Sequence, residues 1–363
     1  MNDNAITSMI DDWIRPEIRD LSAYHVPDSS GLIKLDAMEN PYTWPTQLTD
    51  NWLASLRDAP LNRYPDPTAK SLKIALRETF SIPDGVELML GNGSDELIQM
   101  IAMAVSAPSR TLLATYPSFS MYRIIATMAG LDYREVPLNV DELDIQRDLM
   151  LASIAQHKPA IVFLDYPNNP SGKLFDQETI CEIIETAPGL VVVDEAYYSF
   201  AKRSFIPQIA RYSNLLVLRT LSKMGLAGLR LGFLLGRPDW IEQINKIRLP
   251  YNINILAQLS ATFALKHYDV FCQQTDKICQ DRDNLYREMS VLGGVQVYHS
   301  DANFLLFRVT SRSGNEVFEA IRQQGVLIKN LHSDNSVLSD CLRVTVGRAD
   351  ENASFLAALK SAL

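Results

Sequence analysis

Three short runs of apolar residues constrain the fold of this chain more than any other feature of its sequence. They span residues 160–164, 190–193 and 215–218, and each is a nearly continuous stretch of Ala, Val, Ile, Leu and Phe. A strand covered on both faces has this composition, because neither of its sides meets water. Apolar residues at helical spacing lie between the first two runs, over 177–186. This alternation predicts an α/β fold with a mostly parallel sheet covered by helices.

The same alternation begins near residue 65. We expect a helix that Asp66 caps and Pro67 opens, a strand over 86–90, a helix capped by Ser94, a strand over 111–115 and a helix over 119–128. The pattern changes near Pro250. A smaller α+β part is predicted there, with helical or strand segments at 254–290, 295–298, 303–309, 315–324, 326–329 and 342–346 and a last helix from 351. The predicted division is a large domain over 45–250 and a small domain formed by 1–44 and 251–363.

Composition excludes several classes of protein. The net charge is −9 and no run of Lys and Arg exceeds two residues, which argues against a nucleic-acid partner. Apolar runs reach only about seven residues, so no membrane span is expected, and the acidic start does not resemble a signal peptide. The four cysteines lack C-x-x-C spacing and the five histidines are isolated, so we expect no metal site. A cytoplasmic protein is predicted.

Polar segments follow four of the predicted strands. They are Asp165–Gly172, Asp194–Tyr197, Arg219–Lys223 with Arg230 beyond it, and Gly91–Asp95 at the start of a helix. Each segment alone is typical of an ordinary turn, strand end or helix cap. Ligands of open parallel sheets, however, bind outside the carboxyl ends of the strands. Because all four segments come at such ends, we interpret them as one site.

Together these residues suit one kind of chemistry. The amine of Lys223 can form a Schiff base with an aldehyde, as in pyridoxal-phosphate enzymes. A carboxylate facing the pyridine nitrogen keeps it protonated, and Asp194 is the candidate. Asn169 and Tyr197 are candidates to donate to the phenolic oxygen, and Phe119 is a candidate to stack on the ring.

The phosphate of such a cofactor needs its own donors. The helix start at Ser94 and Asp95 offers backbone N–H groups, which bind phosphate well. Ser222 adds a hydroxyl and Arg230 a bidentate cation.

These motifs resemble the fold-type-I pyridoxal-phosphate aminotransferases, and most closely the histidinol-phosphate aminotransferase family. The resemblance covers nearly the whole chain. Further similar segments are Leu35–Pro41, Asn62–Pro65, Gly91–Leu97 and Cys341–Gly347. It implies a large domain with a mostly parallel sheet and a smaller α+β domain. The implied reaction converts L-histidinol phosphate and 2-oxoglutarate to imidazole-acetol phosphate and L-glutamate.

The resemblance also implies roles for individual residues. Lys223 binds the cofactor and transfers the proton, and Asp194, Asn169 and Tyr197 contact its ring. Tyr64 is similar to a tyrosine that reaches the phosphate bound by the partner subunit, which implies a homodimer with shared sites. The resemblance further implies that the cofactor phosphate is bound by Ser94, Asp95, Ser222 and Arg230. The residues that match substrate-binding positions are Tyr24, Asn40 and Arg343.

Three departures and two alternatives accompany this resemblance. Ser171 and Phe119 stand where relatives often have threonine and tyrosine, and the interval from Lys223 to Arg230 is one residue shorter than in some of them. An aromatic or other amino-acid aminotransferase, or a threonine-phosphate decarboxylase, would keep the same cofactor residues. The decarboxylases tend to carry His-Gly-Gly where this chain has the segment 36–40. A regulatory cofactor-binding module without turnover would need a DNA-binding segment, which the sequence lacks.

Overall fold

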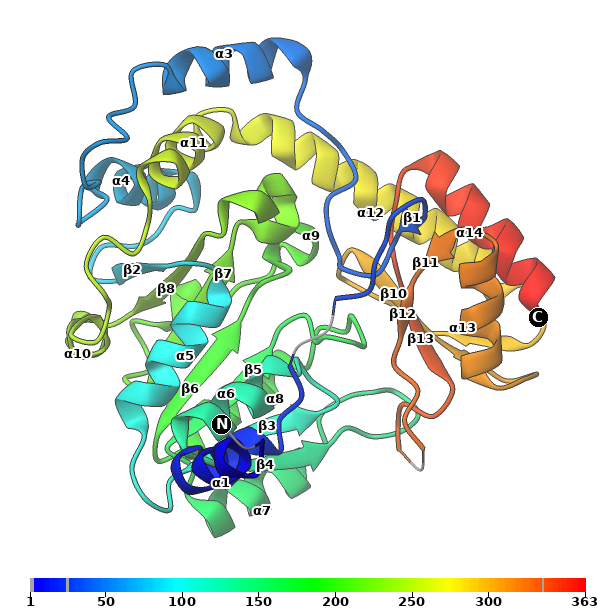
Figure 1. The fold of residues 1–363 in the computed structure, drawn as a ribbon, viewed down its shortest axis with the longest axis horizontal. Helices are drawn as coiled ribbons and strands as arrows, with labels where there is room; N and C mark the ends of the chain where they lie inside the picture. The colour runs from blue at the N-terminus through cyan, green and yellow to red at the C-terminus, as the bar shows by residue number, and fades with distance from the viewer. Residues whose placement is uncertain (1–2, 24–25, 335) are drawn as a thin grey trace.

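The fold contains one large sheet and a smaller group of strands, joined by the long helix α12 (Tyr268–Ser290) (Figure 1). The computed structural model describes residues 3–23, 26–334 and 336–363. The large sheet has seven strands in the order β2-β8-β7-β6-β5-β3-β4. Its strands are β2 (Glu87–Gly91), β3 (Thr111–Tyr116), β4 (Asp132–Pro137), β5 (Ile161–Asp165), β6 (Leu190–Asp194), β7 (Leu215–Thr220) and β8 (Gly232–Gly236).

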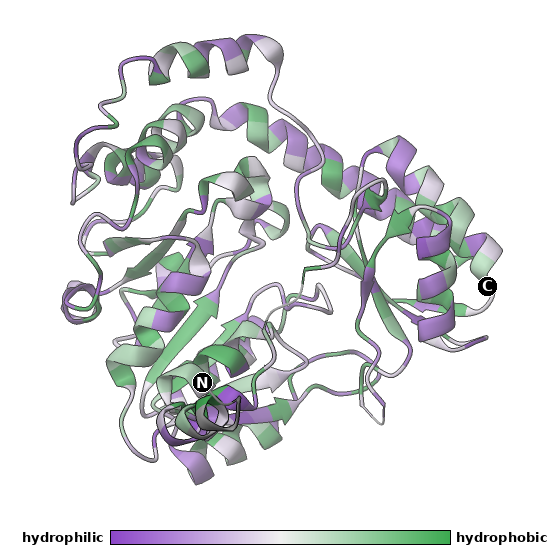
Figure 2. Ribbon diagram, viewed as in Figure 1, coloured by the Kyte–Doolittle hydropathy of each residue, from purple (hydrophilic) through white to green (hydrophobic). Residues whose placement is uncertain are grey.

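Both faces of this sheet are buried, which explains the continuous apolar runs. Along β6, Val191 and Val193 belong to one core cluster, and Leu190 and Val192 belong to another on the opposite face. Successive strand residues point to opposite faces, so every position of such a strand must be apolar. The central strand β6 is hydrophobic along its length in Figure 2. Helices α5 (Ser94–Val105), α6 (Met121–Ala129) and α10 (Pro238–Asn245) cover one face, and α4 (Lys70–Thr79), α7 (Arg147–His157), α8 (Gln177–Thr186) and α11 (Ile255–Leu265) the other.

The prediction of a mostly parallel sheet is confirmed. Strands β3 to β7 pair in parallel, whereas β8 is antiparallel to both β7 and β2. The sequence analysis did not predict β8, since only Phe233, Leu234 and Leu235 mark it between two glycines. Those glycines are required for packing: a Cβ at Gly232 would lie 2.7 Å from the backbone nitrogen of Ser94, and one at Gly236 would lie 2.4 Å from Leu216 Cδ2.

A second group of strands lies at the other end of α12. The sheet order is β12-β13-β10-β9, all antiparallel, and β1 pairs in parallel with β11. The pairing of Ile33 with Val326 brings residues 33–34 to this part, whereas the helix over Pro16–Arg19 contacts α6 beside the large sheet. The elements are β1 (Ile33–Lys34), β9 (Val295–Val297), β10 (Phe304–Val309), β11 (Val326–Leu327), β12 (Lys329–Asn330), β13 (Cys341–Thr345), α13 (Gly314–Gln323) and α14 (Ala349–Ala362).

Three predicted helix positions were wrong. The stretch over 254–290 is two helices, because the chain turns between Leu265 and Tyr268 and α11 packs on α3 (Thr46–Leu56) and α4. Helix α4 begins at Lys70 rather than at Pro67, although Asp66 still accepts hydrogen bonds from the N–H groups of Thr68 and Lys70. Ser94 is the first residue of α5, not its cap, and its side chain makes no capping bond.

The remaining helices lie near the N-terminus and after β6. They are α1 (Asp3–Trp13), α2 (Pro16–Arg19), α3 (Thr46–Leu56) and α9 (Tyr198–Ala201). In the part of the chain that is described, no helix combines the length and the apolar character that crossing a membrane requires. The domain limits at residues 45 and 250 stay a prediction.

Candidate active site

A cavity of about 220 Å³ opens at the carboxyl ends of β5, β6 and β7. Its lining contains nine of the residues that the sequence analysis selected for the cofactor: Ser94, Asp95, Phe119, Asn169, Asp194, Tyr197, Ser222, Lys223 and Arg230. In-register pairing of the parallel strands β5, β6 and β7 brings three of the segments together. The fourth, at the start of α5, follows β2, which joins the sheet through the antiparallel strand β8.

Lys223 lies in a short helical turn, Ser222–Leu226, directly after β7. Its Nζ donates to the backbone oxygen of Ala37 at 3.2 Å. Burial, with a smaller contribution from the nearby positive charge of Arg343, lowers the pKa of Lys223 to about 8. A larger fraction of this amine is therefore neutral, and nucleophilic, near neutral pH than for an ordinary lysine.

Asp194 ends β6 and is buried, with 4% of its surface exposed. Its Oδ2 accepts from the Tyr122 hydroxyl at 2.9 Å, and its Oδ1 accepts from the Ala196 N–H at 3.0 Å. Burial raises the pKa of Asp194 to about 7 although these hydrogen bonds lower it. A buried carboxylate of this kind is stabilised by a cationic N–H group placed opposite it. A protonated pyridine nitrogen supplies such a group.

The loop after β5 orients Asn169. The buried Asp165 carboxylate accepts from the Asn169 N–H at 2.7 Å and from Asn168 Nδ2 at 2.8 Å. Burial raises the pKa of Asp165 to about 6. Arg343 donates from Nη1 to Asn169 Oδ1, which leaves the Asn169 side-chain N–H groups as donors. Burial also raises the pKa of Tyr197 well above its usual value, so its hydroxyl keeps its proton and can donate.

The other end of the cavity suits an anion. Helix α5 begins there, and its first N–H groups have no partner within the helix. Gly93, just before it, has φ +85°, and a Cβ at this position would lie 2.7 Å from Arg230 Nη2. Arg230 also contacts Asp95 at 3.3 Å. The donors and the cavity therefore fit a pyridoxal-phosphate molecule from its phosphate to its ring nitrogen.

A second cavity of about 300 Å³ shares Met38, Phe119 and Asn169 with the first. Arg343 and Lys329 line it from adjacent strands, where they are paired in register. Arg343 is buried, and its Nη2 donates to the Asp36 backbone oxygen at 3.1 Å. The neighbouring cavity thus presents Arg343 and Lys329 next to the cofactor pocket, together with Arg123, which forms an ion pair with Glu135.

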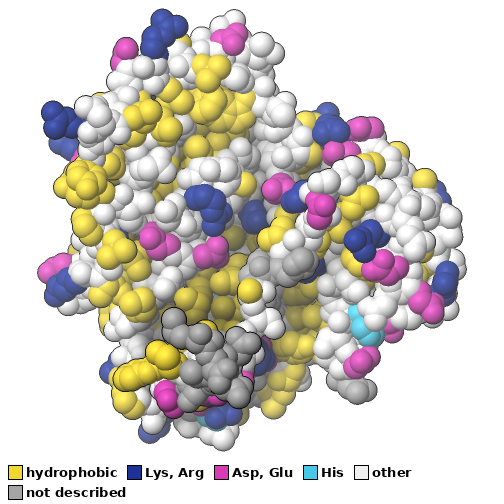
Figure 3. Space-filling model, in the orientation of Figure 1, with side chains coloured by type: hydrophobic (Ala, Val, Ile, Leu, Met, Phe, Trp, Pro, Cys, Tyr) yellow, Lys and Arg dark blue, Asp and Glu magenta, His cyan; other side chains and the backbone are white. Residues whose placement is uncertain are grey.

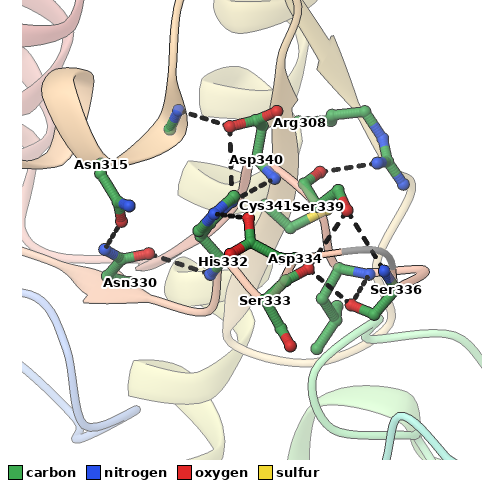
Figure 4. A network of polar contacts seen from close by, with 12 residues as sticks. Arg308, Asn315, Asn330, His332, Ser333, Asp334, Ser336, Ser339, Asp340 and Cys341 are labelled. Carbon is green, nitrogen blue, oxygen red and sulfur yellow. Dashed lines mark hydrogen bonds and ion pairs between the residues drawn. The ribbon is translucent and has the colours of Figure 1, made fainter.

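The segment between β12 and β13 forms part of the wall of this second cavity through Leu331 and Leu338. Figure 4 shows the polar contacts that hold the segment. His332 Nδ1 accepts from the Asp340 N–H at 2.9 Å, and Arg308 donates to two backbone oxygens of the segment, those of Val337 and Ser339. Arg308, His332 and Asp340 are not part of the cavity lining, so contacts outside the lining hold this segment.

Three selected residues that the structure describes, Asn40, Tyr64 and Arg343, do not line the cofactor cavity, and Arg343 lines the neighbouring one instead. Tyr24 lies outside the described residues. Asn40 donates to the Met224 backbone oxygen and to Gln274 Oε1, and its Oδ1 accepts from the Tyr42 N–H. Tyr64 is 79% exposed and stacks on Tyr251 with ring centroids 4.4 Å apart.

The sequence analysis assigned no role to two residues of the site, Asp165 and Tyr122. Asp165 comes directly after the predicted strand over 160–164, and a carboxylate at that position indicates a site residue. Tyr122 lies on the apolar face of α6, where nothing in the sequence distinguishes it from an ordinary core residue. Only the structure shows its contact with Asp194.

Comparison with known proteins agrees with this site. The profile of the family described as aminotransferase class I and II matches residues 30–359, and the chain belongs to this family. It is therefore a pyridoxal-phosphate-dependent aminotransferase, as the sequence motifs led us to expect.

Individual relatives are more specific. The chain is 54% identical, over 96% of its length and 97% of the relative's, to histidinol-phosphate aminotransferase 2 of Nitrosococcus oceani. It is 46% identical to the protein of the same name from Cupriavidus pinatubonensis, over 98% of each chain. Among solved structures, histidinol-phosphate aminotransferase from Clostridium acetobutylicum aligns with a TM-score of 0.82 and 24% identity, over 91% of this chain and 98% of that one. The fold-type-I assignment is confirmed.

The lowered pKa of Lys223 predicts a pH dependence that can be measured on the cofactor-free protein. Reductive methylation requires the neutral amine, so the Lys223 rate should rise with pH with a midpoint near 8. Surface lysines have a reference pKa of about 10.4 and should rise later. Peptide mass spectrometry of one digest compares them directly. A midpoint for Lys223 equal to that of the surface lysines would contradict the effect of burial.

Proposed function

We propose that this chain transfers the amino group of L-histidinol phosphate to 2-oxoglutarate, giving imidazole-acetol phosphate and L-glutamate in histidine biosynthesis. The observation that carries the proposal is the 54% identity, over nearly the full length of both chains, to a relative named for this activity. Arg343 and Lys329 in the lining of the second cavity support it, because both substrates end in an anion.

In the proposed mechanism Lys223 binds the cofactor covalently and is the base that moves the substrate's Cα proton. Its lowered pKa suits this work, because an amine that is partly neutral near neutral pH can accept a proton. When bound, pyridoxal phosphate supplies an electron sink. Asp194 holds the proton on the ring nitrogen, and Asn169 and Tyr197 donate to the phenolic oxygen.

The same proposal gives the other lining residues binding roles. Ser94 and Asp95, largely through backbone N–H groups, and Ser222 and Arg230 bind the cofactor phosphate. Phe119 stacks on the ring face. Because phenylalanine has no hydroxyl, this position makes no hydrogen bond to the cofactor.

Arg343 is the proposed substrate anion site. Its planar guanidinium can bind the phosphate of the donor or a carboxylate of the acceptor, which occupy the site in turn. Tyr24 and Asn40 are the proposed contacts for the imidazole. Both Nδ2 hydrogens of Asn40 have partners, so Asn40 would accept from the imidazole N–H through the second lone pair of its Oδ1.

A homodimer in the cytoplasm completes the proposal. Large apolar side chains are exposed near Tyr64, including Leu61, Leu249 and Tyr251. Hydrophobic side chains gather on the face that carries α3, α4 and α11 (Figure 3). A contiguous apolar surface of this kind is typical of an interface. In the dimer Tyr64 reaches the cofactor phosphate bound by the partner.

The donor specificity tests the proposed reaction. We expect L-histidinol phosphate to be preferred over histidinol by roughly tenfold to a hundredfold in kcat/KM, because histidinol loses a charge-assisted contact. Phenylalanine and aspartate, which lack the imidazole and the phosphate, should be weaker donors. Carbon dioxide is measured in parallel to detect a decarboxylase. Equal rates for histidinol and its phosphate, or a clear preference for phenylalanine, would contradict the substrate assignment and leave the cofactor assignment intact.

Shared sites are tested by subunit mixing. Lys223→Ala and Tyr64→Ala homodimers should each have little activity. A mixed dimer contains one site with both native residues, so random exchange should restore up to about a quarter of the sites. A mixture of two Lys223→Ala preparations is the control. If two folded variants exchange subunits and regain no activity, Tyr64 does not act across the interface.

A further inference from the structure

We propose that Tyr122 is a positioning residue that acts through Asp194, holding its carboxylate ionised and correctly oriented under the cofactor ring. This inference rests on the proposed role of Asp194. It adds a residue on helix α6 that does not line the cofactor cavity.

The ring of Tyr122 is held rigidly. Tyr122 is fully buried and stacks on Phe163 of β5, with ring centroids 4.6 Å apart and an interplanar angle of 19°. On another side it meets Phe119 edge to face, with centroids 5.6 Å apart. These contacts fix the hydroxyl 2.9 Å from Asp194 Oδ2. The phenol therefore donates from a fixed place.

The carboxylate of Asp194 has a protein anchor on each oxygen. The Ala196 N–H holds Oδ1 and the Tyr122 hydroxyl holds Oδ2. The two donors belong to different elements, the turn after β6 and helix α6, so together they set the rotation of the carboxylate about its Cβ–Cγ bond. Loss of the Tyr122 hydroxyl would leave only the Ala196 anchor, which restrains this rotation less than two anchors do.

The charges around Asp194 make this hydrogen bond important. The ionisable neighbours that act on it are Asp165 of β5 and Asp95 of α5, both acidic, and Tyr197 faces it from the turn after β6. Burial and the two acidic groups raise the pKa of Asp194, and the Tyr122 and Ala196 bonds lower it. The pKa of Tyr122 itself is raised well above its usual value by burial, so the hydroxyl remains a donor.

Tyr122→Phe tests the proposal on the holoenzyme, because it removes the hydroxyl and keeps the ring packing. We expect the amino-donor half-reaction, followed by the absorbance of the cofactor, to slow roughly tenfold to a hundredfold at neutral pH, as for the loss of a hydrogen bond to a charged group. With the hydroxyl removed the pKa of Asp194 rises. The acidic limb of the pH–rate profile should therefore move to higher pH.

Tyr212→Phe is the matched control. Tyr212 is also a buried ring, and its hydroxyl donates to Glu185 at 3.1 Å, away from the cofactor cavity. This variant should keep the wild-type rate and acidic limb. Thermal unfolding of both variants separates a loss of fold from a loss of function.

A double-mutant cycle with Asp194→Asn shows whether Tyr122 acts through Asp194. Asp194→Asn alone should slow the half-reaction strongly, and adding Tyr122→Phe to it should change the rate by less than about twofold. A full Tyr122→Phe effect in the Asp194→Asn background, or an unmoved acidic limb in Tyr122→Phe alone, would overturn the inference. If Asp194→Asn keeps the wild-type rate, the proposed role of Asp194 fails instead, and the inference fails with it.

Discussion

The register of three buried parallel strands decides where every polar group of this site lies. Asp165 of β5 is paired with Asp194 of β6, and Asp194 is paired with Leu218 of β7. The strands are apolar on both faces up to these positions, so the first polar residues all appear at one edge. The carboxylates of Asp165 and Asp194 therefore lie next to each other where water is excluded, and burial raises the pKa of both. The site gains a strong local preference for a cationic N–H group, which the cofactor ring offers.

One residue beyond Asp194, the same strand ends carry a buried ion pair. Glu195 and Arg219 lie 2.8 Å apart and both side chains are buried. Arg219 lies over the Tyr198 ring at 3.4 Å, and Glu195 also accepts from the Phe205 N–H. Breaking a pair of this kind costs about 3–5 kcal/mol, since one charge is left buried alone. The pair links β6, which ends in Asp194, to β7, which leads to Lys223, and thereby stabilises the spacing of the two central groups.

The sequence predicted the strand ends well because local chemistry marks them. A buried strand followed by Asp194–Tyr197 or by Ser222–Lys223 is visible in one stretch of residues, and nine such residues meet in one cavity. Other features depend on contacts between distant segments. Tyr122 has the sequence signature of a core residue, and β8 contains only three apolar residues. The amide of Asn40 is bound by Met224 and Gln274, which are far away in the chain. The proposed role of Tyr64, contact with the cofactor phosphate of the partner subunit, depends on a second copy of the chain.

The central claim is that Lys223 holds the cofactor. Reduction of the purified holoenzyme with borohydride fixes a Schiff base as a stable amine, and peptide mass spectrometry then locates the labelled lysine. Our account predicts that the label lies on the peptide that contains Lys223, and that a Lys223→Ala protein prepared in the same way carries none at its active site. A label on another lysine, with Lys223 unmodified, would contradict the account.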